Sequence, residues 1–486
     1  FSISPSVEPF DEVKYKALMD GLECSEVTLS NLEAGYRFDS ELYQKQYIVL
    51  NQFAETHECT TFSQEASLVS KGIFNISASC YAETGVPFVR ISNIDKMLIS
   101  QEDIVYIPEE EHAKHRKTRL VKGDIILSKT GGPAAAYVDM PECNVSQDTV
   151  AIKLKSTSKL LSEYTVAYLN CVYGIAQMKK RFTGNVQMHL NLDDCKNNVI
   201  IPMMSETFQK IISGVFHKGL QLRNNSDQAF AECERLLVDT LGFSEKNITG
   251  SNQTKKSFLA SFGKTGRLDA EYYSPKYDLL YSLIMSRSKD VKTVHDFAVF
   301  NSRGRQPEYD EMGSLQVINS KHILENSLDY EGFEKTATDV WDKYPTSRVT
   351  YGDILTYTTG ANIGRTAVYL STEKAVASNH VNILRTNEPY PIYIAVVMNS
   401  FIGRLQTEKL CGGSAQQELY PAQIDQFIVP FVEEEIQIKI TNAYIEAVER
   451  NRQSQRYFDL TSQTIEIAIE QGEDVALAWL KERSGE

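Results

Sequence analysis

The chain has 486 residues and a formal net charge of -14 at pH 7, with 42% hydrophobic and 10% aromatic residues. This length exceeds one domain, since domains average roughly 150 residues, and the composition is that of a globular protein with a buried core. No apolar run reaches the roughly 20 residues of a membrane-spanning helix, and the N-terminus lacks the basic and apolar parts of a secretion signal. We therefore expect a cytoplasmic protein, not bound to a membrane, whose scattered cysteines are reduced.

Residues 1–203 are expected to form a lead-in followed by a first mixed domain. Short β-rich runs between polar or glycine residues predict strands at 87–91, 124–127 and 149–154. Apolar residues at helical spacing predict a helix over 164–180. A basic run at 112–122 precedes Gly123. It indicates either a nucleic-acid contact or an ordinary solvated face.

Two long amphipathic helices are predicted, over 204–243 and within 431–486, the second followed by a C-terminal tail. Apolar residues recur at spacings of three and four in both, and the narrow stripes are typical of a two-helix coiled coil. Gly219 and Ser226 are expected to weaken the first stripe, and Arg450 and Ser454 lie near the middle of the second. The alternative is that each helix packs along its own domain.

A polar linker and the lead-in of a second unit occupy 244–278, and a second domain is expected over 279–430. Strands are predicted at 315–318, 353–355 and 381–384, and a helix over 393–405. This order of elements repeats that of the first domain. Each long helix then follows a domain that ends in proline, at Pro202 and Pro430.

An internal repeat relates the two halves at offsets of 228 to 232 residues. Gly123-Asp-Ile-Ile and Gly352-Asp-Ile-Leu begin stretches that both reach a Thr-Gly pair, at 130–131 and 359–360. The other matched pairs are Arg37-Phe-Asp-Ser-Glu41 with Arg267-Leu-Asp-Ala-Glu271, Ser146 with Ser378, Asn170 with Asn399, Gly174 with Gly403, and Gly184-Asn-Val-Gln187 with Gly413-Ser-Ala-Gln416. The period is too long for a solenoid. We therefore expect one fold built twice, and a function performed twice.

Catalytic motifs are missing from the repeated positions. The Gly-Lys-Thr at 263–265 lacks the glycine of a phosphate loop, since that position is Phe258. Asn387-Glu-Pro-Tyr390 resembles the Asn-Pro-Pro-Tyr box of amino-methyltransferases but has Glu second and no glycine-rich cofactor loop before it. His112 and His115 have no thiol nearby, and no Ser/His/Asp set repeats. We therefore expect no catalytic residue, metal or cofactor in this chain.

The repeated polar positions are typical of DNA recognition. Asn and Gln pair with adenine, Arg and Lys pair with guanine, and glycines let backbone N–H groups approach phosphates. The acidic net charge argues against a bare DNA-binding protein. Two acidic runs, at 109–111 and 433–435, account for six of the carboxylates, and acidic surface can face a basic partner protein.

Taken together, these motifs resemble those of the DNA specificity subunits of type I restriction–modification systems, over essentially the whole chain. The resemblance rests on the twin Gly-Asp-Ile strands with their Thr-Gly loops, the Gly-x-x-Gln loops, the Arg-x-Asp-x-Glu lead-ins and the long helices. It implies an α+β protein with two tandem, pseudo-symmetric α/β target-recognition domains, separated by two long helices that form an antiparallel coiled coil. One departure is Gly131-Gly-Pro-Ala134, where the second half has Gly360-Ala-Asn-Ile-Gly364.

Membership of that family implies a noncatalytic subunit active in phage defence. Each domain would read one half of a split target in double-stranded DNA. The helices would set the unread spacer and dock two methyltransferase subunits, joined by motor–nuclease subunits. S-adenosylmethionine and ATP would be bound by those partners. In the first half the expected DNA-binding residues are Arg90, Ser92, Lys129, Thr130, Asn185 and Gln187, and in the second half they are Ser320, Lys321, Thr359, Asn362, Gln416 and Gln417.

Two other interpretations remain open from the sequence. The chain starts at Phe1 without Met, which leaves room for the recognition half of a single-chain restriction–methylation enzyme with catalytic domains before Phe1. The other is a coiled-coil scaffold that joins proteins and binds no DNA. Salt-sensitive retention of DNA distinguishes the scaffold from both DNA-binding interpretations.

Overall fold

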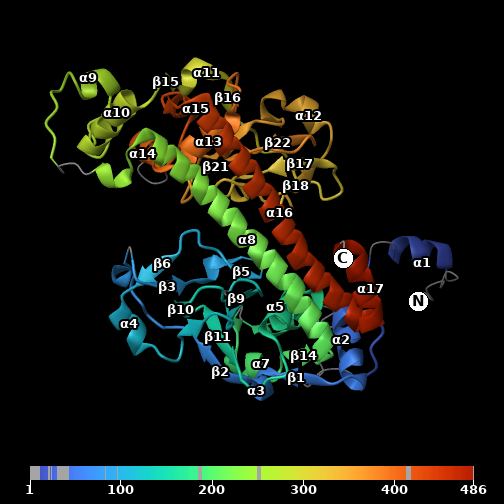
Figure 1. Ribbon diagram of the computed structural model, residues 1–486. Helices are drawn as coiled ribbons and strands as arrows, with labels where there is room; N and C mark the ends of the chain where they lie inside the picture. Colours follow the sequence, from blue (N-terminus) through green and yellow to red (C-terminus); the bar gives the residue numbers. More distant parts are fainter. Residues whose placement is uncertain are drawn as a thin grey trace, which may run out of the picture. The chain divides into compact units, whose positions relative to one another are not determined.

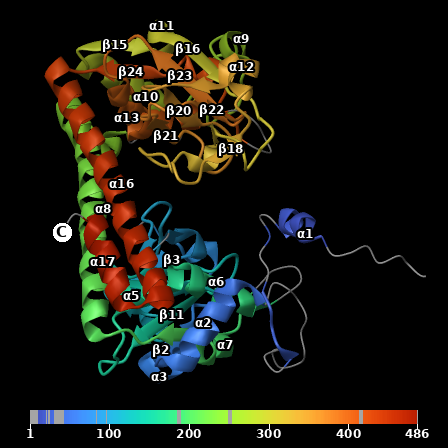
Figure 2. The ribbon, with the colours of Figure 1, turned by 90° about the vertical axis from the view of Figure 1, so that its right-hand side faces the viewer.

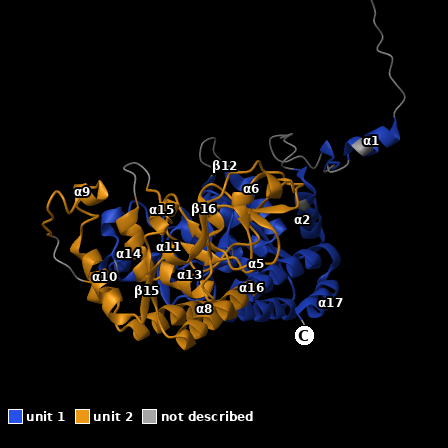
Figure 3. Ribbon diagram, turned by 90° about the horizontal axis from the view of Figure 1, so that it is seen from above, with its two compact units in different colours: residues 1–221, 453–486 blue, residues 222–452 orange. Residues whose placement is uncertain are grey.

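The computed structural model describes residues 11–19, 22, 25–29, 43–82, 84–95, 97–183, 189–248, 253–411 and 417–484. Its contacts divide the chain into unit 1, residues 1–221 and 453–486, and unit 2, residues 222–452 (Figure 3). The long helices α8 (Glu206–Leu241) and α16 (Glu434–Gln471) therefore each contribute to both units. Among the described helices, none combines the length and apolar character needed to span a bilayer.

Unit 1 contains two four-stranded sheets, ordered β6-β3-β10-β7 and β2-β11-β8-β9, and a two-stranded sheet, β1-β14 (Figure 1). Their bounds are β1 Cys59–Thr61, β2 Ala66–Lys71, β3 Val86–Val89, β6 Val105–Ile107, β7 Leu120–Val121, β8 Ile125–Ser128, β9 Ala135–Tyr137, β10 Glu142–Val145, β11 Thr149–Leu154 and β14 Ile200–Pro202. Two smaller ladders pair β4 (Ile94–Asp95) with β5 (Leu98–Ile99) and β12 (Phe182–Thr183) with β13 (His189–Leu190).

Unit 2 repeats the two four-stranded sheets and the β1-β14 sheet of unit 1 strand for strand. Its sheets are ordered β18-β17-β22-β19, β16-β23-β20-β21 and β15-β24. Their bounds are β15 Asp290–Thr293, β16 Ala298–Arg303, β17 Leu315–Ile318, β18 Glu334–Thr336, β19 Arg348–Val349, β20 Ile354–Tyr357, β21 Thr366–Val368, β22 Ala375–Ala377, β23 Val381–Thr386 and β24 Ile428–Phe431. In each unit one pair is parallel, β3 with β10 and β17 with β22. The predicted duplication is confirmed.

Each unit also contains shorter helices, which are labelled in Figures 1 and 2. In unit 1 they are α1 Glu12–Met19, α2 Lys45–Thr56, α3 Phe62–Glu65, α4 Glu109–Lys114, α5 Ser162–Asn170, α6 Val172–Arg181, α7 Leu192–Asn197 and α17 Glu473–Ser484. In unit 2 they are α9 Phe262–Thr265, α10 Pro275–Arg287, α11 Val294–Phe297, α12 Val340–Lys343, α13 Pro391–Asn399, α14 Phe401–Leu410 and α15 Pro421–Ile424.

The Gly-Asp pair of each repeat shapes the turn before a buried central strand. Gly123 and Gly352 have φ of +95° and +87°, a region that suits glycine because it has no Cβ. Asp124 accepts a hydrogen bond from the backbone N of Val121, and Asp353 accepts one from that of Thr350, both at 2.8 Å. These motifs are therefore explained by folding. Each aspartate also lies beside a cation of the neighbouring strand, at 3.2 Å for Lys153 and 2.6 Å for Arg385.

The helices predicted over 164–180 and 393–405 are each interrupted, which the sequence did not indicate. α5 gives way to α6 at Cys171, and α13 gives way to α14 at Ser400. The last residue of the helix before each break is an asparagine whose side chain bonds a strand edge, since Asn170 Oδ1 accepts from Ala135 N at 3.2 Å and Asn399 Oδ1 accepts from Thr366 N at 2.8 Å.

The glycines that follow these breaks permit the close approach of the two helices. A Cβ on Gly174 would lie 2.1 Å from Tyr168 O, and one on Gly403 would lie 1.9 Å from Met398 O. The repeated Asn and Gly positions therefore build the fold, and their recurrence needs no ligand to explain it.

Within each unit, α8 and α16 run side by side in antiparallel directions. In unit 1 the Ser454 hydroxyl donates to Gly219 O at 2.7 Å, and in unit 2 the Ser226 hydroxyl donates to Ala447 O at 2.7 Å. Positions 219 and 226 on α8 are seven residues apart, as are 447 and 454 on α16. A heptad step is the spacing of coiled-coil contacts, so the predicted antiparallel coiled coil is confirmed.

The small residues of the α8 stripe do not weaken it, which corrects the expectation from the sequence. Ser226 is 1% exposed, whereas the neighbouring stripe residues Leu222 and Ala229 are only half-buried. A Cβ on Gly219 would lie 3.2 Å from the ring of Phe458. Gly219 and Ser226 thus lie directly against α16, because small side chains let two backbones come together.

Candidate functional site

In unit 1, the ends of several strands meet along one edge, which we call the unit 1 rim. It comprises 71–72, 90–93, 129–131, 146–148 and 189–190. Backbone hydrogen bonds join these segments: Ser146 N donates to Val89 O at 2.9 Å, Lys129 N to Asp148 O at 2.8 Å, Leu190 N to Lys129 O at 2.9 Å and Gly72 N to Thr149 O at 3.1 Å. The main chain therefore holds the segments of the rim together.

The unit 2 rim is built from equivalent segments, 303–305, 319–322, 358–360, 378–380 and 418–419. Its bonds match those of unit 1: Ser378 N donates to Ile318 O at 2.9 Å, Thr358 N to His380 O at 3.1 Å, Leu419 N to Thr358 O at 2.9 Å and Gly304 N to Val381 O at 3.0 Å. The same backbone arrangement thus presents different side chains in the two units. That is the pattern expected of two sites that bind related but different ligands.

One glycine in each rim lets two backbone segments cross. A Cβ on Gly72 would lie 1.9 Å from Ser146 O, and a Cβ on Gly304 would lie 2.0 Å from Ala377 O. Both contacts are with backbone, which a flexible side chain could not relieve. The sequence analysis missed these glycines, although their offset of 232 residues is the one that relates Ser146 to Ser378.

The predicted residues of unit 1 that the structure describes all lie on its rim. Arg90 and Ser92 belong to the short turn after β3, where Arg90 Nη2 donates to Asp103 O at 2.5 Å and Ser92 is exposed. Lys129 follows β8 and is half-buried, whereas Thr130 is only 3% exposed and pairs with His189 in an isolated bridge. Asn185 and Gln187 lie outside the described residues.

The predicted residues of unit 2 lie on or beside the unit 2 rim. Ser320 and Lys321 occupy the turn after β17, and Lys321 forms an ion pair with Glu334. Asn362 lies in the turn between β20 and β21, where its carbonyl accepts from Arg365 N at 3.2 Å. Gln417 is exposed beside the rim, and Gln416 lies outside the described residues.

Thr359 is 7% exposed, and its hydroxyl lies 3.1 Å from Nδ1 of His380. The two repeated threonines, Thr130 and Thr359, are therefore buried at their rims, where their side chains support the backbone. His380 itself is exposed, as is Asn379 before it. Neither side chain was among the DNA-binding residues expected from the sequence, where the repeat was noted at this point only for Ser146 and Ser378.

Two lysines define the charge of the unit 1 rim. Lys71 ends β2 opposite Val150 of β11, and Val150 lies opposite Leu127 of β8. Directly opposite residues point to the same face of a sheet, and so do residues two apart on one strand. Lys71 and Lys129 therefore share a face. Burial, then the charge of Lys71, lowers the pKa of Lys129, and Asp148 offsets part of this effect.

The corresponding cation of unit 2, Arg303, is held by its own rim. It ends β16 and is 232 residues after Lys71. Its Nη2 donates to Leu419 O at 3.0 Å, and its Nη1 lies 3.7 Å from a Glu418 carboxylate oxygen. Its guanidinium also lies 4.4 Å from the ring centroid of Tyr420. Within the described rims, Glu418 offsets the charge of Arg303 in unit 2. In unit 1 the corresponding cation, Lys71, lies beside a second cation, Lys129.

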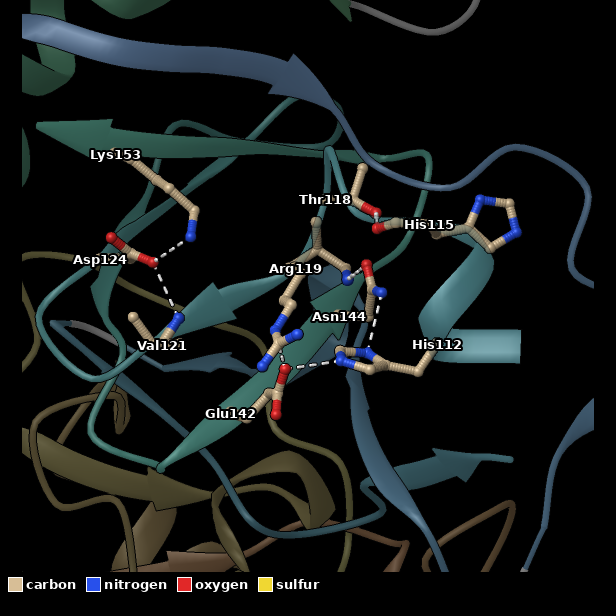
Figure 4. Close-up of polar contacts among 10 residues, drawn as sticks. His112, His115, Thr118, Arg119, Val121, Asp124, Glu142, Asn144 and Lys153 are labelled. Atoms are coloured by element: carbon tan, nitrogen blue, oxygen red, sulfur yellow. Dashed lines mark hydrogen bonds and ion pairs between the residues drawn. The ribbon is translucent and has the colours of Figure 1, made fainter. Parts of the chain in front are cut away.

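Several residues of the basic run at 112–122 contact neighbouring acids, and Figure 4 shows His112 and Arg119 beside Glu142. His112 is buried, with Nε2 2.7 Å from Glu142 Oε1 and Nδ1 3.1 Å from Asn144 Nδ2. Arg119 forms an ion pair with the same Glu142, and Lys122 lies 2.9 Å from Asp139. These contacts favour the structural interpretation of the run over a nucleic-acid contact.

A buried histidine organises the turn at 319–322 of the unit 2 rim. His322 is 1% exposed, its Nδ1 accepts from Asn319 N at 2.9 Å, and its Nε2 lies 3.2 Å from Glu334 Oε2. Burial lowers the pKa of His322 despite the opposing effect of Glu334. The neutral ring therefore accepts the backbone bond that fixes the turn carrying Ser320 and Lys321.

The lead-in of the second repeat is attached to the helix that precedes Gly413. Arg267 donates to both oxygens of Asp269, at 2.9 and 2.6 Å, and to Cys411 O at 3.5 Å. Lys409 lies 5.6 Å from the ring centroid of Tyr277, and in unit 1 Lys180 lies 5.0 Å from that of Tyr47. The repeated lead-in is therefore a folding element. Its first-half Arg37–Glu41 lies outside the described residues.

Among the described residues, no group of three or more His, Cys, Asp or Glu side chains is arranged to hold a metal ion.

No family model matches the chain, and no curated protein matches it. The chain is similar to three solved structures. A type I restriction–modification S subunit from M. genitalium is 12% identical, with a TM-score of 0.35, over 87% of this chain and 95% of that one. The HsdS subunit from Thermoanaerobacter tengcongensis is 12% identical, with a TM-score of 0.27, over 85% and 97%. A chain from a structure of complex assembly and conformational transition in the type I R-M system is 12% identical, with a TM-score of 0.27, over 87% and 97%.

Proposed function

We propose that this chain is the sequence-specific DNA-recognition subunit of a type I restriction–modification complex. The observation that carries the proposal is the pair of rims: one backbone arrangement occurs twice, with side chains that differ between the two copies. A protein that reads two different half-sites needs a constant scaffold with variable side chains. A scaffold protein without a ligand has no need for two such edges.

The exposed rim side chains have the chemistry of base and phosphate contacts. Ser92 and Lys129 in unit 1, and Lys321, Asn379 and Gln417 in unit 2, are exposed or half-buried. Each good bidentate contact discriminates against a wrong base by about 1–3 kcal/mol, so each unit requires several. Asn185, Gln187 and Gln416 remain proposed DNA-binding residues. Ser320 and Asn362, which lie in turns on or beside the unit 2 rim, remain proposed DNA-binding residues as well.

The paired helices fit the role of a spacer. Two weak half-site contacts on one chain gain affinity through effective concentration only when their separation matches the target. The helix contacts recur in a heptad register in both units. We propose that α8 and α16 fix the unread spacer and dock two methyltransferase subunits, with motor–nuclease subunits joining the complex.

The chemistry of modification and cleavage would then belong to those partners. S-adenosylmethionine and ATP are proposed to bind the methyltransferase and motor subunits, with this chain supplying neither catalytic residue nor cofactor site. The acidic net charge of -14 is compatible with this division, because the chain would bind DNA as one part of a larger assembly.

Methylome sequencing of a host that carries the chain with its partner methyltransferase tests the proposal. The expected result is a methylated motif made of two defined half-sites around a spacer of fixed length and free sequence. A continuous motif, or none that depends on this chain, would contradict it. A parallel assay follows retention of duplex DNA by the purified complex, which should fall steeply with salt.

A further inference from the structure

The unit 1 rim contains an unusual arrangement of charge that unit 2 lacks. Lys71 and Lys129 lie on one face of the β2-β11-β8 sheet, on strands separated by a single strand. Strands at that separation are about 10 Å apart, which two lysine side chains can span from opposite sides. Val150 itself is fully buried, but Lys71 ends β2 and Lys129 follows the end of β8, so their ammonium groups can reach a common point beyond these strand ends.

Among the described residues, the acid beside this pair is Asp148, which is opposite Lys129 where Lys129 N donates to Asp148 O at 2.8 Å. Lys71 is exposed and lies over the ring of Phe74, with its Nζ 4.8 Å from the ring centroid. The pKa of Lys129 is lowered by burial and by the charge of Lys71, and the carboxylate of Asp148 only partly opposes this. Two like charges held near one another, one of them half-buried, are stabilised when an anion comes between them.

Unit 2 has different residues at the three positions that correspond to Lys71, Lys129 and His189. Arg303 replaces Lys71, Thr358 replaces Lys129, and Glu418 stands where unit 1 has His189. Glu418 and two backbone carbonyls surround the guanidinium. The unit 2 rim thus places a carboxylate, Glu418, beside this cation, whereas the unit 1 rim has a second lysine and a histidine at the corresponding positions and its acid, Asp148, is opposite Lys129.

We propose that Lys71 and Lys129 together bind one phosphate of the DNA backbone at the unit 1 half-site. The inference rests on the proposed function and extends it. It makes the two units unequal: unit 1 gains affinity from a phosphate held at this point, and unit 2 has no such contact at the equivalent point. Lys129 is then a residue that positions unit 1 on the duplex, and it does not read a base.

The test measures binding of the full chain to a mixed-sequence duplex of about 30 base pairs while salt varies between about 50 and 200 mM. Each phosphate neutralised contributes about 0.9 to the slope of log affinity against log salt. The double variant Lys71→Met/Lys129→Met should flatten the slope by about 0.9, the value for one shared phosphate. A loss of about 1.8 would mean two separate contacts, and no loss would mean none. Either result overturns the proposal.

Two matched controls separate this effect from general changes of charge or folding. Lys210→Met removes one charge from an exposed lysine of unit 1 that pairs with Glu206 at 2.6 Å, and it should leave the slope unchanged. Arg303→Met/Glu418→Gln removes the unit 2 ion pair at constant net charge, and it should also leave the slope unchanged. A flatter slope in the second control would contradict the inequality of the units. Thermal unfolding confirms that each variant folds.

The methylome of a host that carries the double variant distinguishes a phosphate contact by the two lysines from reading of a base. A phosphate contact predicts the same motif at lower occupancy, because phosphates are present at every sequence. Relaxation of one base in the unit 1 half-site would show that the lysines read a base, and would overturn the proposal while leaving the proposed function intact. Failure of the unchanged chain to bind DNA, alone and in its complex, would instead remove the proposed function.

Discussion

The hydroxyl of Ser454 donates a hydrogen bond to the carbonyl oxygen of Gly219 at 2.7 Å, across the contact between α16 and α8 in unit 1. Ser226 makes the same bond to Ala447 in unit 2. The two serines are 228 residues apart, and so are the two acceptors, so the repeat extends into the helices. The same serine-to-carbonyl hydrogen bond therefore fixes the register of α8 against α16 in both units.

Replacing these serines should weaken each unit separately. Ser454→Ala removes one hydrogen bond in unit 1, which is worth about 1 kcal/mol, and should lower the unfolding temperature of that unit by about 2–4 °C. Ser226→Ala should do the same to unit 2, and calorimetry measures both. The control is Ser286→Ala, which removes an exposed hydroxyl bonded only within α10. Equal shifts in control and test variants would contradict this assignment.

The crossing glycines should be the least tolerant positions of the rims. Gly72→Ala and Gly304→Ala each place a Cβ about 2 Å from a backbone oxygen, so the strands must separate, at a cost of about 1–3 kcal/mol or more. Gly214→Ala is the matched control, because it is exposed within α8 with no atom within 4 Å of the added Cβ. It should stabilise the helix by about 1 kcal/mol. Chemical denaturation compares all three.

Unit 2 should lose stability as the pH falls below that at which histidine normally titrates. Burial lowers the pKa of His322 from its ordinary value of 6.5. The unfolded chain therefore binds the proton more readily, and stability declines from pH 6.5 downwards until the folded form also protonates. His322→Gln should be less stable at neutral pH and should lack this part of the pH dependence. An unchanged slope in the variant would show that another group is responsible.

Gln417 should contribute to the choice of one base. It is exposed beside the unit 2 rim, and a glutamine that pairs bidentately with adenine discriminates by about 1–3 kcal/mol. Gln417→Ala should relax one position of the unit 2 half-site in the methylome while the other half-site keeps its sequence. Weaker methylation with an unchanged motif would assign Gln417 to a phosphate or to support of the backbone.

Much of the fold could be predicted because its signals are local or repeated. The strands at 125–128 and 354–357 have apolar runs bounded by glycine, and both long helices have their stripes. The breaks at Cys171 and Ser400 could not be predicted, since they depend on asparagine bonds to strands distant in the sequence. The importance of Gly219 and Ser226 was missed because stripe analysis favours large apolar residues, whereas close helix approach needs small ones.

The site was predicted less completely, for a physical reason. Residues that recur in both halves of the chain are mainly those that the shared fold requires. Several of them, such as Asp353, Asn399 and Thr359, are buried and form hydrogen bonds within the protein. Residues that touch a ligand should differ between the halves when the half-sites differ. Lys71 and His380 differ in this way from their counterparts Arg303 and Asp148, and such differences are found by comparing the rims position by position once the register of the strands is known.

The rims are joined through main-chain N–H and C=O groups, and any residue except proline can supply both. Exchanging the side chains there leaves those bonds intact, as the two halves of this chain already demonstrate. Under the proposed function, new target sequences are therefore accessible through substitutions of the exposed rim side chains, and the crossing glycines Gly72 and Gly304 are rim positions where a substitution is expected to destabilise the fold.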